Sequence, residues 1–107
     1  MDIKIKTVIT GEESFFGPGV YELLKGIEDT GSIQAASAEM RMSYTKCWRI
    51  IKRAERETGF AFLTRKKGGK DGGKSELTEE GRVFMQKYIA MDADIKAYAD
   101  KTFKKYF

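Results

Sequence analysis

Two short amphipathic helices joined by a break of about two residues constrain the fold of this chain more than any other feature. Ser32 and Ser43 are good N-caps, and apolar residues at helical spacing follow each of them, which predicts helices over about 33–40 and 43–58. Gly59 is placed to end the second helix. Small side chains at positions 35 to 38 leave room for another helix to cross the first one closely.

The second of these helices has one apolar and one basic side. Cys47, Trp48, Ile51 and Ala54 recur at helical spacing, and we interpret them as the buried stripe. The opposite side carries Thr45, Lys46, Arg49, Lys52, Arg53 and Arg56. Residues 41–74 contain eleven basic residues (Lys or Arg) and three acidic ones (Asp or Glu). The rest of the chain contains nine basic and thirteen acidic residues. A chain polarised in this way has one surface suited to a polyanion.

A glycine- and lysine-rich hairpin follows the basic helix. Residues 60–64 are typical of a strand, and Glu76 and Leu77 are typical of the strand that returns. The residues between them, 66–74, contain four glycines and four lysines. Helix, short break, capped basic helix and hairpin together predict a winged helix-turn-helix. In that fold the second helix, the recognition helix, enters the major groove of DNA. The hairpin, here the wing at 65–74, lies on the flanking backbone.

The segments before this unit predict a strand and a helix. Residues 3–9 begin as an alternation of apolar and polar side chains, which indicates a half-buried N-terminal strand. Phe15 and Phe16 are expected to point inward from the turn that follows. Pro18 is suited to the first position of a helix that Gly31 ends.

The segment after the hairpin predicts one long helix, over 78–103, with Thr78 as its cap. Residues 104–107 are expected to be a frayed end. A seam along this helix is suited to a partner helix and is our predicted dimer interface: Phe84, Tyr88, Met91, Ile95, Tyr98 and Thr102. The fold class is therefore mainly α with a small β-hairpin, in one domain over 1–107.

Composition excludes several functional classes. The chain has no histidine and one cysteine, so zinc ligand sets and Ser-His or Cys-His nucleophile pairs are missing. We expect no enzymatic activity, no metal site and no cofactor. The lone Cys47 cannot form an internal disulfide, and no long apolar run or signal peptide is present, which favours a cytoplasmic protein that does not contact a membrane.

The predicted DNA contacts fall into three groups. The leading end of the recognition helix meets base edges, and Arg49, one turn further on, is placed for a bidentate contact with guanine. Arg53 and Arg56 lie farther back and are better placed for phosphate, while wing cations supply affinity and salt dependence. Tyr44 is interpreted either as a packing residue or as a DNA contact. The predicted set is Ser32, Gln34, Ser43, Tyr44, Thr45, Lys46, Arg49, Arg53, Arg65, Lys66, Lys67, Lys70 and Lys74.

Several segments, taken in order, carry a resemblance to a known family. They are FFGPG at 15–19, GSIQAA at 31–36, MSY at 42–44 with Trp48, GGKDGG at 68–73 and LTEEG at 77–81. Over roughly residues 15–90 the chain resembles the N-terminal, LysR-type DNA-binding domain of the ModE family of bacterial molybdate-responsive regulators. Relatives often carry glycine at the position of Arg41, so a left-handed Arg41 would cost about 1 kcal/mol.

The resemblance implies a homodimer joined through the long terminal helix, with help from the helix that begins at Pro18. Such a dimer binds double-stranded DNA at two half-sites about 34 Å apart. In the family a separate C-terminal domain binds molybdate or tungstate. The resemblance does not extend to that domain, so we do not expect molybdate binding here.

Simpler structural interpretations remain open at this point. The basic side of the recognition helix could be an ordinary surface in contact with water. The seam of the last helix could pack on the chain's own first helix. The main alternative function is a winged-helix interaction module that partners a separate sensor protein. Such a module would more naturally expose apolar residues where this sequence places charge.

Overall fold

A computed structural model describes residues 1–66 and 74–107 of the chain. Within them four helices form: α1 (Pro18–Thr30), α2 (Ile33–Glu39), α3 (Tyr44–Thr58) and α4 (Glu79–Tyr106). Two antiparallel pairs of short strands accompany them: β1 (Ile9–Thr10) with β2 (Ser14–Phe16), and β3 (Leu63–Lys66) with β4 (Lys74–Leu77). The predicted mainly helical winged helix-turn-helix is confirmed.

The helices begin and end where local sequence signals place their caps. The side chain of Ser32 accepts a hydrogen bond from the backbone N–H of Ala35 at 3.0 Å, and that of Ser43 from Lys46 at 3.1 Å. Thr78 caps α4 in the same way. Each hydroxyl satisfies a backbone donor that lacks a partner within the first turn of its helix.

The connection between α2 and α3 contains a backbone conformation that is rare for a side chain larger than glycine. Arg41 has φ of 55°, the one non-glycine residue with positive φ in the described part of the chain. Its N–H donates to the carbonyl of Ala38 at 3.1 Å, and the N–H of Met42 donates to Ser37 at 2.9 Å. Arg41 therefore adopts the left-handed conformation whose cost was considered above, and it turns the chain from α2 into α3.

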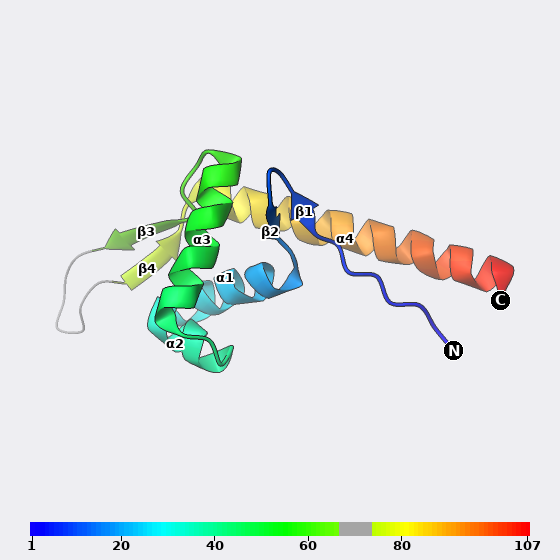
Figure 1. The fold of residues 1–107 in the computed structure, drawn as a ribbon, viewed down its shortest axis with the longest axis horizontal. Helices are drawn as coiled ribbons and strands as arrows, with labels where there is room; N and C mark the ends of the chain where they lie inside the picture. The colour runs from blue at the N-terminus through cyan, green and yellow to red at the C-terminus, as the bar shows by residue number, and fades with distance from the viewer. Residues whose placement is uncertain (67–73) are drawn as a thin grey trace.

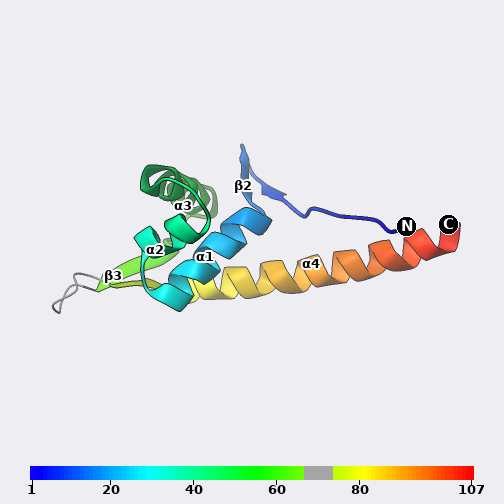
Figure 2. The ribbon, with the colours of Figure 1, turned by 90° about the horizontal axis from the view of Figure 1, so that it is seen from below.

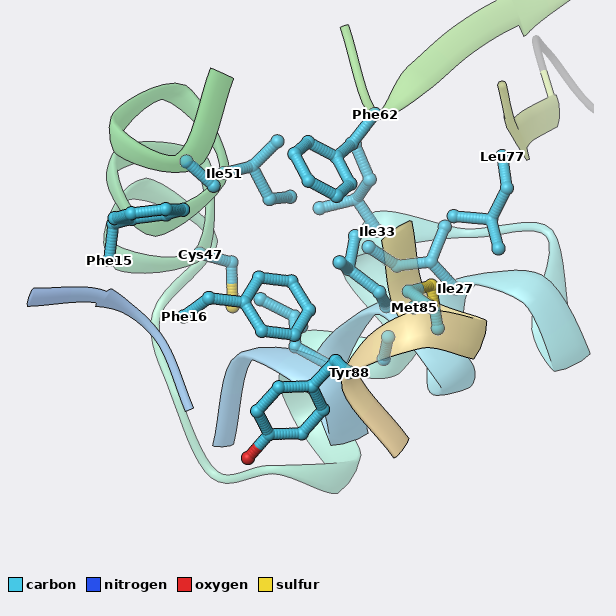
Figure 3. Close-up of a cluster of buried hydrophobic side chains, with 14 residues drawn as sticks. Phe15, Phe16, Ile27, Ile33, Cys47, Ile51, Phe62, Leu77, Met85 and Tyr88 are labelled. Atoms are coloured by element: carbon cyan, nitrogen blue, oxygen red, sulfur yellow. The ribbon is translucent and has the colours of Figure 1, made fainter. Parts of the chain in front are cut away.

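The core lies where the three-helix unit, the base of the wing and the first half of α4 meet (Figure 3). Phe16 lies at its centre, with ring centroids of Phe84 and Tyr88 at 4.8 and 4.9 Å and Phe62 at 6.0 Å. The largest fully buried side chains are Phe16, Phe62, Leu23, Leu24, Ile27, Ile51 and Cys47. The predicted inward positions of Phe15 and Phe16 are confirmed.

Helix α4 starts close against the strand that leads into the wing. A Cβ on Gly81 would lie 3.0 Å from the carbonyl oxygen of Phe62 and 3.1 Å from the hydroxyl of Thr78. A side chain at this position would force these neighbours to move apart, so glycine suits the close crossing. The contact fixes the wing relative to α4.

The predicted N-terminal strand over residues 3–9 is wrong. Only Ile9–Thr10 pair, with β2, and residues 1–8 form no regular element. Alternating polarity requires a partner strand, and none of the described residues supplies one. The segment instead extends alongside α4, with the N-terminus near the far end of that helix (Figures 1 and 2). Close to β1 it is joined to the first half of α4 by a 2.9 Å hydrogen bond from the Tyr88 hydroxyl to the carbonyl of Thr7.

The same region of α4 carries a buried carboxylate, Asp92. An ion pair with Lys96, one turn further on, joins Asp92 Oδ2 and Lys96 Nζ at 3.0 Å. This contact lowers the pKa of Asp92 below its usual value. Burial raises the pKa of the neighbouring Tyr88 phenol.

Two predicted boundaries also differ from the structure. The strand expected at 60–64 begins at Leu63, because Phe60 and Phe62 pack against the core before pairing starts. The end of the chain is not frayed, since α4 continues to Tyr106. The rings of Phe103 and Phe107 stack at 5.2 Å along this last turn.

Candidate nucleic-acid interface

Helix α3 lies on the outside of the body with the wing strands beside it (Figure 1). Cys47, Ile51 and Ala54 are buried, and they orient the helix so that the opposite side faces solvent. That outer face carries four exposed side chains at helical spacing: Thr45, Arg49, Lys52 and Arg56. Neither Arg49 nor Arg56 forms an ion pair with any residue that the structure describes.

The leading end of α3 is exposed and polar. The four consecutive residues at this end are all exposed: Ser43, Tyr44, Thr45 and Lys46. The Ser43 hydroxyl is already used as an acceptor by the N–H of Lys46. This end of the helix therefore presents side chains of the types that contact base edges in the major groove.

A chain of contacts joins α3 to the wing. The hydroxyl of Tyr44 accepts a hydrogen bond from Arg65 Nη2 at 3.1 Å, and the Tyr44 ring meets Trp48 edge-on at 6.2 Å. Lys52 Nζ lies over the Trp48 ring, 5.2 Å from its centroid. Trp48 packs against the core but is half-buried, so the predicted buried stripe of α3 reaches the surface at this residue. Along the helix it lies one turn from Tyr44 and one turn from Lys52.

A second connection fixes the base of the wing to α3. Glu55 Oε2 accepts a hydrogen bond from the N–H of Phe62 at 2.8 Å, and Glu55 Oε1 lies 3.2 Å from Lys52 Nζ. A third connection joins β4 to the end of α1, where the N–H of Ser75 donates to the carbonyl of Gly31 at 2.9 Å. The wing base is therefore held from both sides.

Arg53 lies on the flank of α3 away from the wing. Its Nε is 3.1 Å from Glu13 Oε2 in the loop between β1 and β2. Lys46 lies on the same flank. The predicted phosphate contact by Arg53 would therefore have to compete with a carboxylate of the chain itself.

The remaining predicted DNA residues are distributed around the helix-turn-helix. Ser32 is half-buried and caps α2, while Gln34 is exposed on its first turn. Arg65 and Lys74 are exposed on β3 and β4. Lys67 and Lys70 lie outside the described residues, and the side chain of Lys66 is not described either.

The predicted contact set omits two features of this surface. Arg56 was interpreted as suited to phosphate but was left out of the set, and it is exposed on the same outer face as Arg49. The bond between Tyr44 and Arg65 joins residues 21 positions apart. Its only sequence signal is a hydroxyl at the start of α3 and a cation at the start of the wing.

The predicted dimer seam divides into two parts. Tyr88 packs in the core of its own chain and is only 2% exposed, so its assignment to a dimer interface is wrong. Phe84 is half-buried and packs against the same core, and its place in the seam stays a prediction. Regular spacing along a helix does not tell which partner covers it. Beyond this point Met91, Ile95 and Tyr98 are exposed, while Thr102 is half-buried.

Residues 1–66 and 74–107 hold neither a metal-ligand cluster nor a helix suited to a membrane. Nowhere in these two ranges do three or more Cys, Asp or Glu side chains gather as metal ligands. Helix α4, the longest element there, is too polar for a membrane span, and the shorter helices do not qualify either.

Comparison with known proteins identifies relatives of the central part of the chain. Residues 21–82 match the family described as bacterial regulatory helix-turn-helix protein, lysR family. The chain is 30% identical over 79 residues to the molybdenum transport protein ModE of Azotobacter vinelandii, and 30% identical over 86 residues to the transcriptional regulator ModE of Haemophilus influenzae. These alignments cover 74% and 80% of this chain but only 29% and 34% of the relatives.

A solved structure has a similar fold. The chain in the crystal structure of the CbnR_DBD-DNA complex superposes with a TM-score of 0.61 at 17% identity, over 82% of this chain and 95% of that one. The match of residues 21–82 to a regulatory family also confirms the expectation that the chain is not an enzyme.

Proposed function

Because this chain belongs to the lysR family of bacterial regulatory helix-turn-helix proteins and carries its DNA-binding domain, we propose that it regulates transcription by binding a specific double-stranded sequence. The outer face of α3 is the observation that supports this proposal best. Arg49 and Arg56 lie there, exposed and without an ion-pair partner among the described residues, beside a wing that is fixed to the same helix.

In the binding mode that we propose, α3 with its cap (residues 43–58) enters the major groove, which is about 12 Å wide and admits one helix. Thr45 and Arg49 are nearest its leading end and face base edges. Arg56, about two turns further along the same face, approaches the backbone as the helix leaves the groove. The wing, residues 65–74, follows the flanking phosphates.

A pair of arginine variants tests this mode. A preferred duplex is first selected from genomic fragments with the purified protein, and affinity is then measured on that duplex and on random duplex. Arg49→Ala is expected to cost about 1–3 kcal/mol on the preferred duplex and to relax the preference at one base position. Arg56→Ala is the matched control, because it removes the same side chain from the same face.

Arg56→Ala is expected to weaken both duplexes by similar factors, since a phosphate contact carries no base information. Equal losses on both duplexes for Arg49→Ala would exclude a base-reading role for Arg49. Absence of binding to any duplex at low ionic strength would exclude the proposed function itself.

We also propose that the protein acts as a homodimer joined by the second half of α4. This half extends past the body of the domain (Figure 2), and it exposes Met91, Ile95 and Tyr98 on one side. Exposed apolar side chains that follow one side of a helix are typical of a helix-helix contact.

The dimer is tested by sedimentation of two charge variants. Ile95→Asp places a carboxylate in the apolar seam and is expected to give monomers. Ala93→Asp adds the same charge on the opposite side of the helix, where the residue is exposed, and is expected to sediment as the unchanged protein does. A monomeric unchanged protein, or equal dissociation by both variants, would contradict the proposed contact.

The remaining assignments are narrower. We treat residues 1–107 as one domain, because one buried cluster joins β2, α1, α3 and α4. The molybdenum-related names of the relatives describe proteins of which the alignments cover about a third, so molybdate is not assigned to this chain. The cytoplasmic location stays a prediction.

A further inference from the structure

A groove of about 320 Å³ lies on the flank of α3 that faces away from the wing. The N-terminal segment, the start of α1, the connection from α2 to α3 and α3 itself enclose it. Five half-buried apolar side chains contribute to its lining: Pro18, Val20, Met40, Met42 and Ile50. All five retain surface that water contacts, although Val20, Met42 and Ile50 also pack on the core.

The rim of this groove is positively charged. Lys6, Lys46 and Arg53 are among its lining residues, which include no Asp or Glu. Arg53 is engaged by Glu13, but Lys6 and Lys46 are exposed and form no ion pair with the residues that the structure describes. Two uncompensated cations therefore stand beside an apolar floor.

We propose that this groove binds a small amphiphilic anion, with an apolar body on the floor and one carboxylate or sulfonate head between Lys6 and Lys46. Small-molecule sites are typically apolar concavities with a few polar groups that fix orientation, and this volume lies at the lower end of their range. A phosphodiester backbone would match the cations but would leave the apolar floor exposed. The occupant thus needs both an apolar part and a charge.

Both requirements can be tested by measuring the affinity of simple compounds for the whole protein in the absence of DNA. Decanoate carries the apolar body and the charge, decanol lacks the charge and acetate lacks the body. We expect saturable binding of decanoate by calorimetry, and binding of decanol and acetate that is at least about tenfold weaker. Methyl NMR shifts should occur at Val20, Met42 and Ile50 and not at Ile95, which lies on the exposed side of α4.

Two variants of the N-terminal segment provide the matched comparison. Lys6→Glu reverses a rim charge and is expected to weaken decanoate about three- to tenfold, as expected for an exposed charge interaction. Lys4→Glu makes the same change two residues earlier, outside the groove, and should leave the affinity unchanged.

Equal weakening by both variants would show attraction by net charge only and would overturn the proposal. Shifts centred on Ile95, or equal binding of decanol, would overturn it as well, because the ligand would then occupy the apolar side of α4. Since no DNA is present in these measurements, their failure leaves the proposed function of α3 and the wing untouched.

Discussion

The hydrogen bond between Tyr44 and Arg65 makes a prediction about how the recognition helix assists the wing. Arg65 is an exposed cation on β3 with a long side chain, and the Tyr44 hydroxyl holds its guanidinium at 3.1 Å. Tyr44 itself is kept in place by its edge contact with Trp48. Tyr44→Phe removes the acceptor oxygen and retains the ring contact, so it should release Arg65 without moving α3.

The expected magnitude follows from the entropy of one side chain. Ordering a long side chain at an interface costs about 0.5–1.5 kcal/mol of binding free energy. A hydrogen bond that already orders the side chain in the free protein reduces this cost when DNA binds. Tyr44 is 41% exposed, so water weakens the bond and the lower part of that range applies. We therefore expect Tyr44→Phe to weaken DNA binding by about two- to fivefold.

A double-mutant cycle measured by fluorescence anisotropy on labelled duplex tests this reasoning. Arg65→Ala should weaken binding on preferred and random duplex alike and lower the slope of log affinity against log salt by about 0.9. Tyr44→Phe should leave that slope unchanged, because Arg65 still reaches its phosphate. The double variant should bind no more weakly than Arg65→Ala alone.

Tyr106→Phe, which removes a hydroxyl from an exposed residue at the far end of α4, serves as the control and should have no effect. Additive losses from Tyr44→Phe and Arg65→Ala would refute the argument, since Tyr44 would then act on DNA independently of Arg65. A changed salt slope in Tyr44→Phe would refute it too.

Three further changes test other parts of the structure. Replacing the wing lysines at 66, 67 and 70 by glutamine should weaken binding to every sequence and lower the slope of log affinity against log salt by up to about 0.9 per lost contact. An unchanged slope would show that the wing does not contact DNA. Gly81→Ala should lower the free energy of unfolding in denaturant by about 1–3 kcal/mol, because its Cβ would lie 3.0 Å from the Phe62 carbonyl oxygen. An unchanged unfolding midpoint would contradict the close approach of α4 to Phe62. Arg41→Gly should raise stability by about 0.5–1 kcal/mol, because glycine adopts φ of 55° without strain, whereas a lower melting temperature would show that the left-handed turn is not strained.

Features that depend on a few neighbouring residues could be predicted from the sequence. The caps at Ser32, Ser43 and Thr78 act within one helical turn, so each can be recognised from its own segment. The basic side of α3 follows from helical spacing in the same way, and this allowed the exposed position of Arg49 to be predicted. These local signals determined the fold class.

Features that depend on distant partners could not be predicted. The alternating residues 3–9 have the pattern of a strand, but pairing needs a neighbour that the pattern does not reveal. The spacing of Tyr88 fits a dimer seam and a core position equally well, and its contact with Phe16 decided between them. Arg53 was placed on the basic side correctly, yet its pairing with Glu13 joins residues 40 positions apart.

The length of α4 has a consequence for which operators the protein can recognise. The helix begins beside the wing and continues for 28 residues, about 42 Å at 1.5 Å per residue. If α4 helices of the proposed dimer pair antiparallel along the DNA axis, the crossing point moves in steps of about one helical turn, because a smaller step would turn a different side of the helix to the partner. One turn shifts each recognition helix by about 5.4 Å and the pair by about 11 Å, roughly the rise of three base pairs, so substitutions far from DNA, at the crossing, would select the spacing of half-sites.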